Sequence, residues 1–233
     1  VAQFENRVER LYVCLPYNIY AIACNVIKRR NTLMFGEALR QILSRLNAPL
    51  SRFSTDLVKR VQNSLDSKTI EIFDNIRCEF FRGFLFVYRE DNIPSLSEPV
   101  DVYLGSHIVQ NYGEVIITPG RDKGNRLLED GTGHATLAIS SSSKMYITNP
   151  GPGETFHPFK TSERRFTQFA RDRKIPRFLR SSLPVMYIDG SPAWTMGAGI
   201  SNLHKVTEDD SLFIHATLNG EWIKLIESLR HYL

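Results

Sequence analysis

The stretch from Asn149 to Gly199 reads NPGPGETFHPFKTSERRFTQFARDRKIPRFLRSSLPVMYIDGSPAWTMGAG, and its series of turns, helix and hairpin decides the fold of the second half of the chain. Residues 161–174 carry apolar residues at helical spacing, which predicts a helix. Pro176 ends this helix, because proline disfavours helical backbone at the residue before it. Two strand-like runs follow, Val185–Ile188 and Ala193–Met196, separated by the turn dipeptide Asp189-Gly190.

Basic residues crowd one part of this stretch. Residues 160–180 hold eight basic and two acidic residues, an excess of six charges, whereas the whole chain of 233 residues has a net charge of +4. On a helical wheel, Phe166, Phe169 and Ala170 fall on one side and basic residues on the other. The pattern therefore predicts a helix that buries an aromatic stripe and presents a basic ridge, formed by Arg164, Arg171 and Lys174 with Arg165 near its flank.

A ridge of this kind suits a phosphate backbone. Each phosphate–cation contact releases counterions, and the arginine fork grips phosphate oxygens with two bonds. Two other interpretations stay open, a solvated helix face and an acidic partner other than nucleic acid. The candidate binding residues are Lys160, Arg164, Arg165, Arg171, Lys174, Arg177 and Arg180.

Outside this stretch, the sequence predicts an α+β protein of two units, with Asp91–Pro99 as the linker because it is rich in proline and serine. The first unit, residues 1–92, is expected to be helical over 2–11, 32–46 and 55–65, with a small antiparallel hairpin sheet after the helices. Residues 12–27 fit either strands or a short helix. The second unit, residues 100–233, is expected to be a β-rich α+β domain that closes with a helix burying Trp222, Leu225, Ile226 and Leu229.

Several kinds of chemistry find no support in the sequence. The three cysteines form no CxxC pair and are expected in the core, so neither a disulfide framework nor a zinc site is predicted. The six histidines, His157 included, lack metal-binding spacing, and no GxSxG string marks a serine nucleophile. Phe80, Phe81, Phe84 and Phe86 fit core packing or base stacking. No metal or cofactor is expected on this chain.

No apolar stretch is long enough for a membrane helix, and no signal peptide is visible. We therefore expect a cytoplasmic protein with no membrane partner. The first residue is Val1 rather than Met, which favours a chain that continues upstream.

The stretch after Asn149 resembles the C-terminal domain of tRNA(Ile)-lysidine synthetases. That domain typically shows a Pro-Gly-[Asp/Glu]-Arg start and a Lys-x-Pro-x-x-x-Arg-x-x-x-Pro-[Val/Leu] run. Gly153 and Glu154 match the start, but Thr155 stands where the family usually has arginine. The first unit, with helices followed by TIEIFDNIRCEFFRGFLFVYRE, resembles the family's middle domain. The run is matched in spacing by Lys174, Pro176, Arg180, Pro184 and Val185.

The resemblance implies a parent enzyme that joins lysine to the wobble cytidine of a CAU-anticodon isoleucine tRNA, with ATP and Mg as cofactors. It implies that this chain is the portion that holds tRNA, and that the last domain reaches toward the acceptor stem. The family's Ser-Gly-Gly-x-Asp-Ser phosphate loop does not occur here. ATP binding is therefore expected in an N-terminal domain of the same protein, and catalysis by this chain alone stays open.

Three hypotheses remain at this point. The chain is the tRNA-binding portion of a lysidine synthetase, a stand-alone RNA-binding or adaptor module without catalysis, or an unrelated small-molecule enzyme. An upstream reading frame with the phosphate loop would separate the first from the second, and ATP consumption by this chain alone would favour the third. A homodimer is compatible with all three.

Overall fold

The computed structural model describes residues 8–9, 11–28, 32–64, 69–120, 133–207 and 212–233. They form two compact units, unit 1 within Val1–Ile93 and unit 2 within Pro94–Tyr232. Helices and antiparallel sheets occur in both units, so the chain has the α+β class that the sequence predicts.

Unit 1 is built on a five-stranded antiparallel sheet in the order β1-β2-β5-β4-β3. The predicted hairpin sheet corresponds to its last three strands. The ambiguous residues 12–27 form a strand hairpin that runs into the short helix α2 (Cys24–Lys28), and this hairpin extends the sheet through the pairing of Tyr20 with Val87. The strands are β1 (Tyr12–Leu15), β2 (Ile19–Ala23), β3 (Thr69–Phe73), β4 (Ile76–Phe81) and β5 (Phe84–Arg89).

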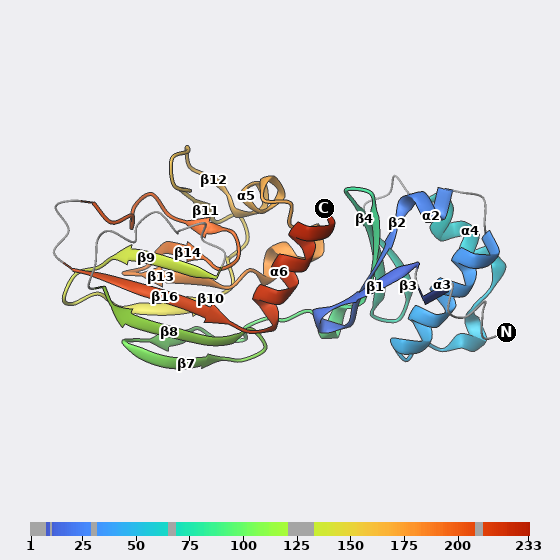
Figure 1. The fold of residues 1–233 in the computed structure, drawn as a ribbon, viewed down its shortest axis with the longest axis horizontal. Coiled ribbons are helices and arrows are strands. Elements are labelled where there is room, and N and C mark those ends of the chain that lie inside the picture. The colour runs from blue at the N-terminus through green and yellow to red at the C-terminus, as the bar shows by residue number, and fades with distance from the viewer. Residues whose placement is uncertain (1–7, 10, 29–31, 65–68, 121–132, 208–211) are drawn as a thin grey trace. The chain divides into compact units, whose positions relative to one another are not determined.

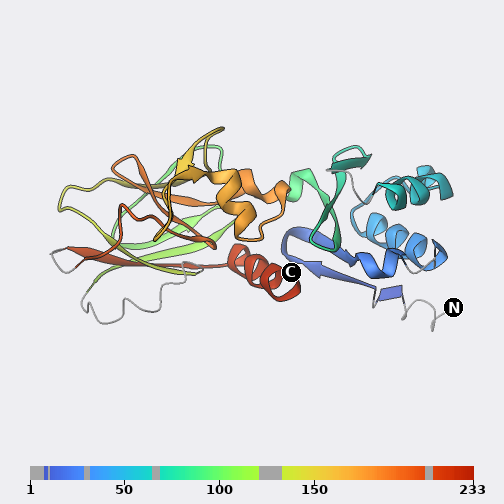
Figure 2. The ribbon, with the colours of Figure 1, turned by 90° about the horizontal axis from the view of Figure 1, so that it is seen from above.

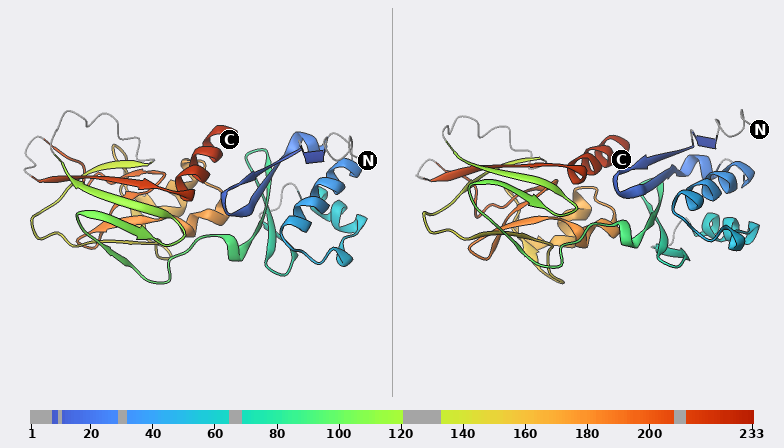
Figure 3. Two further views of the ribbon diagram at one scale, coloured as in Figure 1. Left: turned by 60° about the horizontal axis from the view of Figure 1, so that its bottom comes forward. Right: turned by 90° about the horizontal axis from the view of Figure 1, so that it is seen from below.

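Two longer helices, α3 (Thr32–Arg45) and α4 (Thr55–Asn63), lie on the same side of this sheet (Figures 1 and 3). The N-terminus of α4 is capped by Ser54, whose Oγ accepts a hydrogen bond from the Leu57 amide at 3.2 Å. Of the helix expected over 2–11, Val8, Glu9 and Leu11 are described; Val8 and Glu9 are helical, and Leu11 lies in a turn. Leu65, the last residue of the helix expected over 55–65, lies outside the described residues.

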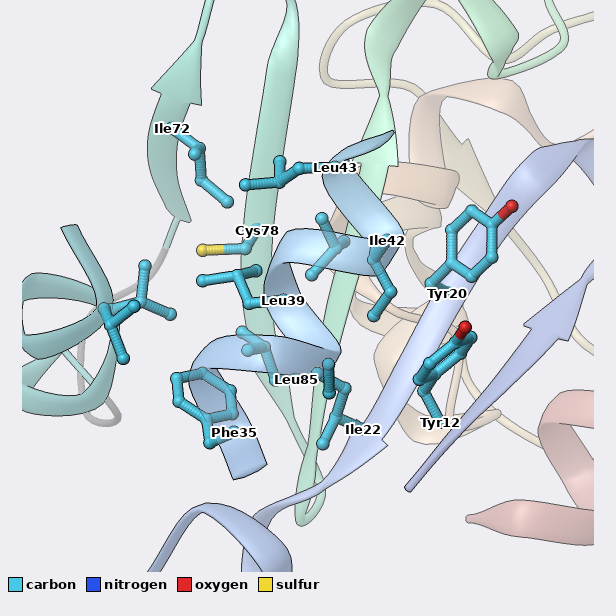
Figure 4. Close-up of a cluster of buried hydrophobic side chains, with 14 of the residues drawn as sticks. Tyr12, Tyr20, Ile22, Phe35, Leu39, Ile42, Leu43, Ile72, Cys78 and Leu85 are labelled. Atoms are coloured by element: carbon cyan, nitrogen blue, oxygen red, sulfur yellow. The ribbon is translucent and has the colours of Figure 1, made fainter. Parts of the chain in front are cut away.

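The core of unit 1 forms where α3 meets the sheet (Figure 4). Phe35, Leu39, Ile42 and Leu43 of α3 are fully buried, and the sheet contributes residues such as Ile22, Cys78 and Leu85. These α3 positions recur every three or four residues, so they share one helix face. Burying each such side chain contributes about 1.5–3 kcal/mol, which makes this face the main attachment of α3 to the sheet.

The cysteines divide by environment. Cys78 is buried on β4, and this burial raises the pKa of its thiol to about 12. Cys14 is exposed on β1 and Cys24 is half-buried, so the expectation of three core cysteines is correct only for Cys78.

Unit 2 contains two larger antiparallel sheets that lie in two layers (Figures 1 and 2). The five-stranded sheet has the order β15-β14-β13-β10-β6, and the four-stranded sheet has the order β7-β8-β16-β9. The first sheet comprises β6 (Val100–Val102), β10 (Met145–Thr148), β13 (Val185–Ile188), β14 (Ser191–Thr195) and β15 (Gly199–Ile200). The second comprises β7 (Gly105–Val109), β8 (Gly113–Pro119), β9 (His134–Ala138) and β16 (Phe213–Asn219).

The last helix, α6 (Glu221–Tyr232), buries the face that its sequence predicts, including Trp222, Leu225, Ile226 and Leu229. The indole Nε1 of Trp222 donates a hydrogen bond to the Met196 carbonyl at 3.0 Å. Gly197 follows with φ of 89°, and a Cβ there would lie 2.9 Å from Ile226 Cγ1. Glycine is therefore required where α6 packs on the β14–β15 turn.

The basic stretch is a long insertion between two neighbouring strands. β10 and β13 pair directly, with Thr148 opposite Val185, so residues 149–184 connect the two strands of one hairpin. This connection contains β11 (Thr155–Phe156), β12 (Arg164–Arg165), α5 (Phe166–Asp172) and a 3₁₀ segment (Arg177–Ser182).

A buried hydrogen-bond network closes the base of this connection. The Tyr112 hydroxyl lies 2.8 Å from the Ser182 carbonyl and 3.1 Å from the Pro94 carbonyl, and it accepts a hydrogen bond from Asn149 Nδ2 at 2.9 Å. Asn149 also donates to the Leu183 carbonyl at 3.1 Å and accepts from the Leu96 amide at 2.7 Å. Pro94 and Leu96, which belong to the predicted linker, are thus bound to unit 2.

Replacing Tyr112 with phenylalanine should lower the free energy of unfolding by about 1–3 kcal/mol, because it leaves buried polar partners without the hydroxyl. Urea unfolding measures this change. The matched control is Tyr103→Phe on an exposed ring, which should change stability by less than about 0.5 kcal/mol. Equal effects of the two substitutions would contradict the role of the network.

Residues 1–93 should fold without the rest of the chain, because unit 1 has its own core between α3 and the sheet. Circular dichroism of this fragment should show a cooperative thermal transition. Aggregation, or a transition without cooperativity, would show that the predicted boundary does not separate two independent domains.

Candidate nucleic-acid interface

The basic stretch folds as a strand followed by a short helix. β12 pairs with β11, with Thr155 opposite Arg165, and α5 begins directly afterwards at Phe166. The Phe166 amide donates to the Glu154 carbonyl at 3.1 Å, so the β11 segment satisfies a free N–H at the start of the helix. The predicted helix over 161–174 is therefore wrong in extent, because strand pairing replaces its first turn.

Stacked aromatic rings hold α5 in place. The Phe156 ring lies 5.1 Å from that of Phe166 and 4.8 Å from that of Phe169, measured between centroids, and all three side chains are buried. A Cβ at Gly199 would lie 3.5 Å from the end of the Phe169 ring, which places α5 beside β15. The aromatic stripe predicted from the sequence is thus correct, and Phe156 on β11 completes it.

The end of α5 is a Schellman motif with lysine in the position that glycine usually takes. The Lys174 amide donates to the Arg171 carbonyl at 3.0 Å, and the Ile175 amide donates to the Ala170 carbonyl at 2.9 Å. Lys174 has φ of 64°, a left-handed conformation that is costly for residues with a Cβ. The strained backbone points the lysine out of the helix end, where its side chain is exposed.

The predicted site residues fall into two groups. Arg164 and Arg180 are half-buried and bind within the protein: Arg164 pairs with Asp172 at 3.0 Å, and Arg180 Nε donates to the Ile175 carbonyl at 3.1 Å. The other five predicted residues have exposed side chains, and so does Arg173, which was not among them. These five are Lys160, Arg165, Arg171, Lys174 and Arg177.

The single ridge expected along one helix therefore does not form as predicted. Arg164 and Arg165 lie on β12, Arg171 lies on α5, and Lys174 lies beyond the helix end. The exposed cations are instead distributed over a strand, a helix and a turn of one small subdomain. Such a set can contact several phosphates without following one helix axis.

Asp172 is one of the acidic groups near this set. It pairs with Arg164 and lies 3.7 Å from Arg171 Nε, whose side chain is 61% exposed. Exposed ion pairs contribute only about 0–1 kcal/mol, so a phosphate can compete for Arg171. Beside these residues lies a pocket of about 560 Å³, lined by Thr155, Ser162, Glu163, Arg164, Arg165 and Gln168.

The acidic residue of the Pro-Gly-Glu sequence has a structural role. Glu154 accepts hydrogen bonds from the Tyr187 hydroxyl at 2.8 and 2.9 Å and from the Gly151 amide at 2.8 Å. Burial and the Glu154 carboxylate raise the pKa of Tyr187 above its ordinary value. Thr155, which stands in place of arginine, donates a hydrogen bond to Glu163.

One aromatic residue of the site was not predicted. The exposed ring of Phe159 has the ammonium groups of Lys160 and Lys205 at 5.0 and 6.0 Å from its centroid. The adjacency of Phe159 and Lys160 is visible in the sequence, but Lys205 is brought to the ring only by the fold. Of the aromatic residues considered for stacking, Phe86 belongs to the core, whereas Phe80, Phe81 and Phe84 are half-buried.

No metal-binding group is present in the described part of the chain, where no three His, Cys, Asp or Glu residues are placed to hold an ion. In the same ranges, every helix is too short or too polar to cross a membrane.

Comparisons with known proteins assign the region that carries this site. Residues 146–215 match a family model described as TilS substrate C-terminal domain. A tRNA(Ile)-lysidine synthase of Azoarcus sp. (strain BH72) is 28% identical over 135 residues, which is 57% of this chain and 27% of that protein. A crystal structure of a TilS C-terminal domain aligns with a TM-score of 0.43 and 13% identity over 52% of this chain and 94% of the other.

The basic subdomain lies within the residues that match this model. This part of the chain is therefore similar to the TilS substrate C-terminal domain. The chain spans only 27% of the length of the curated relative that it matches.

Replacing Lys174 with glycine should raise the free energy of unfolding by about 0.5–1 kcal/mol, because glycine adopts this positive φ without a steric cost. Lys174→Ala keeps the Cβ and should leave stability within about 0.5 kcal/mol of the parent. Urea unfolding of both variants measures the difference. A glycine variant less stable than the alanine variant would show that the left-handed backbone is not strained.

Proposed function

We propose that this chain is the tRNA-recognition portion of a lysidine synthase. The observation that supports this most is the group of exposed cations Lys160, Arg165, Arg171, Lys174 and Arg177, held on a small subdomain within a TilS-type domain. Cations spread over a rigid surface recognise a folded RNA by its phosphates and shape. Tertiary contacts fix the backbone beneath the cations, so little ordering is needed on binding.

In this proposal, the parent protein is an ATP-dependent carbon–nitrogen ligase. It joins lysine to the wobble cytidine of a CAU-anticodon isoleucine tRNA in the cytoplasm. ATP and Mg would be held by an N-terminal domain of the same protein, because the Ser-Gly-Gly-x-Asp-Ser loop is absent from this sequence and the described residues offer no acidic cluster for the metal. The role of this chain is to bind and orient the tRNA.

The cations of the site have two roles, support of the subdomain and contact with the RNA. Arg164 and Arg180 brace the subdomain through Asp172 and the Ile175 carbonyl. Arg165, Arg171, Lys174 and Arg177 then present their charges to the RNA from a backbone that these contacts fix. An arginine can grip one phosphate with two bonds, and a lysine provides a point charge.

A second candidate is a stand-alone RNA-binding or adaptor module. The missing phosphate loop favours it for the chain taken alone. The two candidates predict the same RNA surface and differ in whether an upstream domain modifies the bound RNA.

Replacing both Arg171 and Lys174 with alanine should weaken binding to an isoleucine tRNA transcript and lower its salt dependence. For each phosphate that the variant no longer neutralises, the slope of log affinity against log salt should fall by about one. Electrophoretic mobility shifts over a salt series measure both quantities.

The matched control replaces Lys144 and Lys224 with alanine, because these exposed lysines lie outside the basic stretch and the change in net charge is identical. Wild-type salt dependence in the Arg171/Lys174 variant, or an equally large decrease in affinity in the control, would reject the proposed surface.

A further inference from the structure

The turn at Phe159 presents an aromatic ring close to two cations. Phe159 is 38% exposed, although its neighbour Pro158 and nearby Phe156 are buried. The ammonium groups of Lys160 and Lys205 lie 5.0 and 6.0 Å from the ring centroid. Neither lysine forms an ion pair with an acidic residue in the described ranges of the chain.

The backbone holds this ring in place. The Phe159 amide donates to the Ile200 carbonyl at 3.0 Å, and the Asn202 amide donates to the His157 carbonyl at 2.8 Å. Pro158 and Ser201 form a β-bridge between these two bonds. The turn is closed by the Thr161 amide, which donates to the Pro158 carbonyl at 3.2 Å. These backbone hydrogen bonds fix the turn that carries Phe159. The large apolar ring nevertheless remains partly exposed to solvent.

We infer that Phe159 is a stacking platform for one unpaired nucleotide of the bound RNA, with Lys160 and Lys205 contacting the flanking phosphate. This inference rests on the proposed tRNA-binding function and adds to it an RNA element and the residues that hold it. Every base has a π-face, so stacking on one ring is tolerant of sequence.

Stacking of a base on the Phe159 ring is more favourable than the cation–π contacts that the ring makes with Lys160 and Lys205. A base stacked on an aromatic side chain contributes more than an exposed cation–π contact does. A flexible lysine displaced from the ring remains close enough to pair with the phosphate of the same nucleotide. The two cations therefore support stacking and do not block it.

The exposed Phe159 ring indicates that the base stacked on it is unpaired. Bases inside an RNA helix have both faces covered by their neighbours, and proteins contact such helices through phosphates and ribose hydroxyls. The exposed arginines of the basic stretch provide those contacts without an aromatic ring. Lys160 belongs to both sets, which joins the platform to the charged surface along the chain.

The test uses the full chain and two RNA probes. One probe is a short blunt-ended RNA duplex. The other is the same duplex extended at one end by a few unpaired nucleotides that include a fluorescent purine analogue. The wild-type protein should bind the extended probe more tightly and quench its fluorescence, because stacking on an aromatic ring quenches such analogues.

Phe159→Leu keeps an apolar side chain and removes the π-face. It should weaken binding of the extended probe by roughly tenfold, abolish quenching and leave affinity for the blunt duplex unchanged. Phe159→Tyr should restore both signals. Lys205→Ala should weaken binding of the extended probe and reduce its salt dependence.

The outcomes separate the two proposals. Equal wild-type affinity for the two probes without quenching overturns the stacking platform and leaves the tRNA-binding proposal standing. An equal decrease in affinity for both probes in Phe159→Leu shows that the ring is structural, which also overturns the platform. Failure of wild type to bind either probe or a tRNA transcript rejects the proposed function, and the platform with it.

Discussion

Unit 2 depends on one buried hydrogen-bond network, centred on the Tyr112 hydroxyl and the Asn149 amide. Asn149 begins the connection between β10 and β13, and the carbonyls of Ser182 and Leu183 lie at its end. Both ends of the basic stretch are therefore fixed to the same side chains. A buried polar group that loses its hydrogen-bond partner lowers the stability of the fold. The network therefore favours a single arrangement of the two ends of the basic stretch. The aromatic stack of Phe156, Phe166 and Phe169 then fixes its middle.

Much of the fold can be predicted from local pattern. β13 has the predicted limits, the Asp189-Gly190 turn separates β13 from β14, and α6 buries the predicted face. The errors arise where distant segments decide the structure. Arg164 and Arg165 form a strand because β11 lies beside them, and propensity alone cannot reveal this partner. No strand was predicted over β16, although it is an inner strand of the four-stranded sheet and its buried Ile214, Ala216 and Leu218 alternate with less buried residues.

For the candidate site too, local features can be predicted from the sequence, whereas contacts between distant residues cannot. The local excess of charge identifies the stretch on which the exposed cations lie, since charge is a property of the sequence itself. The role of each cation depends on the fold, because Arg164 meets Asp172 and Arg180 meets the Ile175 carbonyl only after α5 and the turn have formed. Lys205 reaches the Phe159 ring from a segment far along the chain, so no spacing rule could connect them. Sequence therefore located the basic stretch, and tertiary structure distinguished its half-buried cations from its exposed ones.

The position of the basic stretch between two paired strands bears on how such a domain can be engineered. Residues 149–184 leave and re-enter the sheet at neighbouring points, as an ordinary hairpin loop does. The entropic cost of closing a loop grows slowly, by about 0.6 kcal/mol for each doubling of its length. A connection of this length is therefore compatible with direct pairing of β10 and β13. Protein engineers can transplant the connection as one unit by cutting at the same two strand ends.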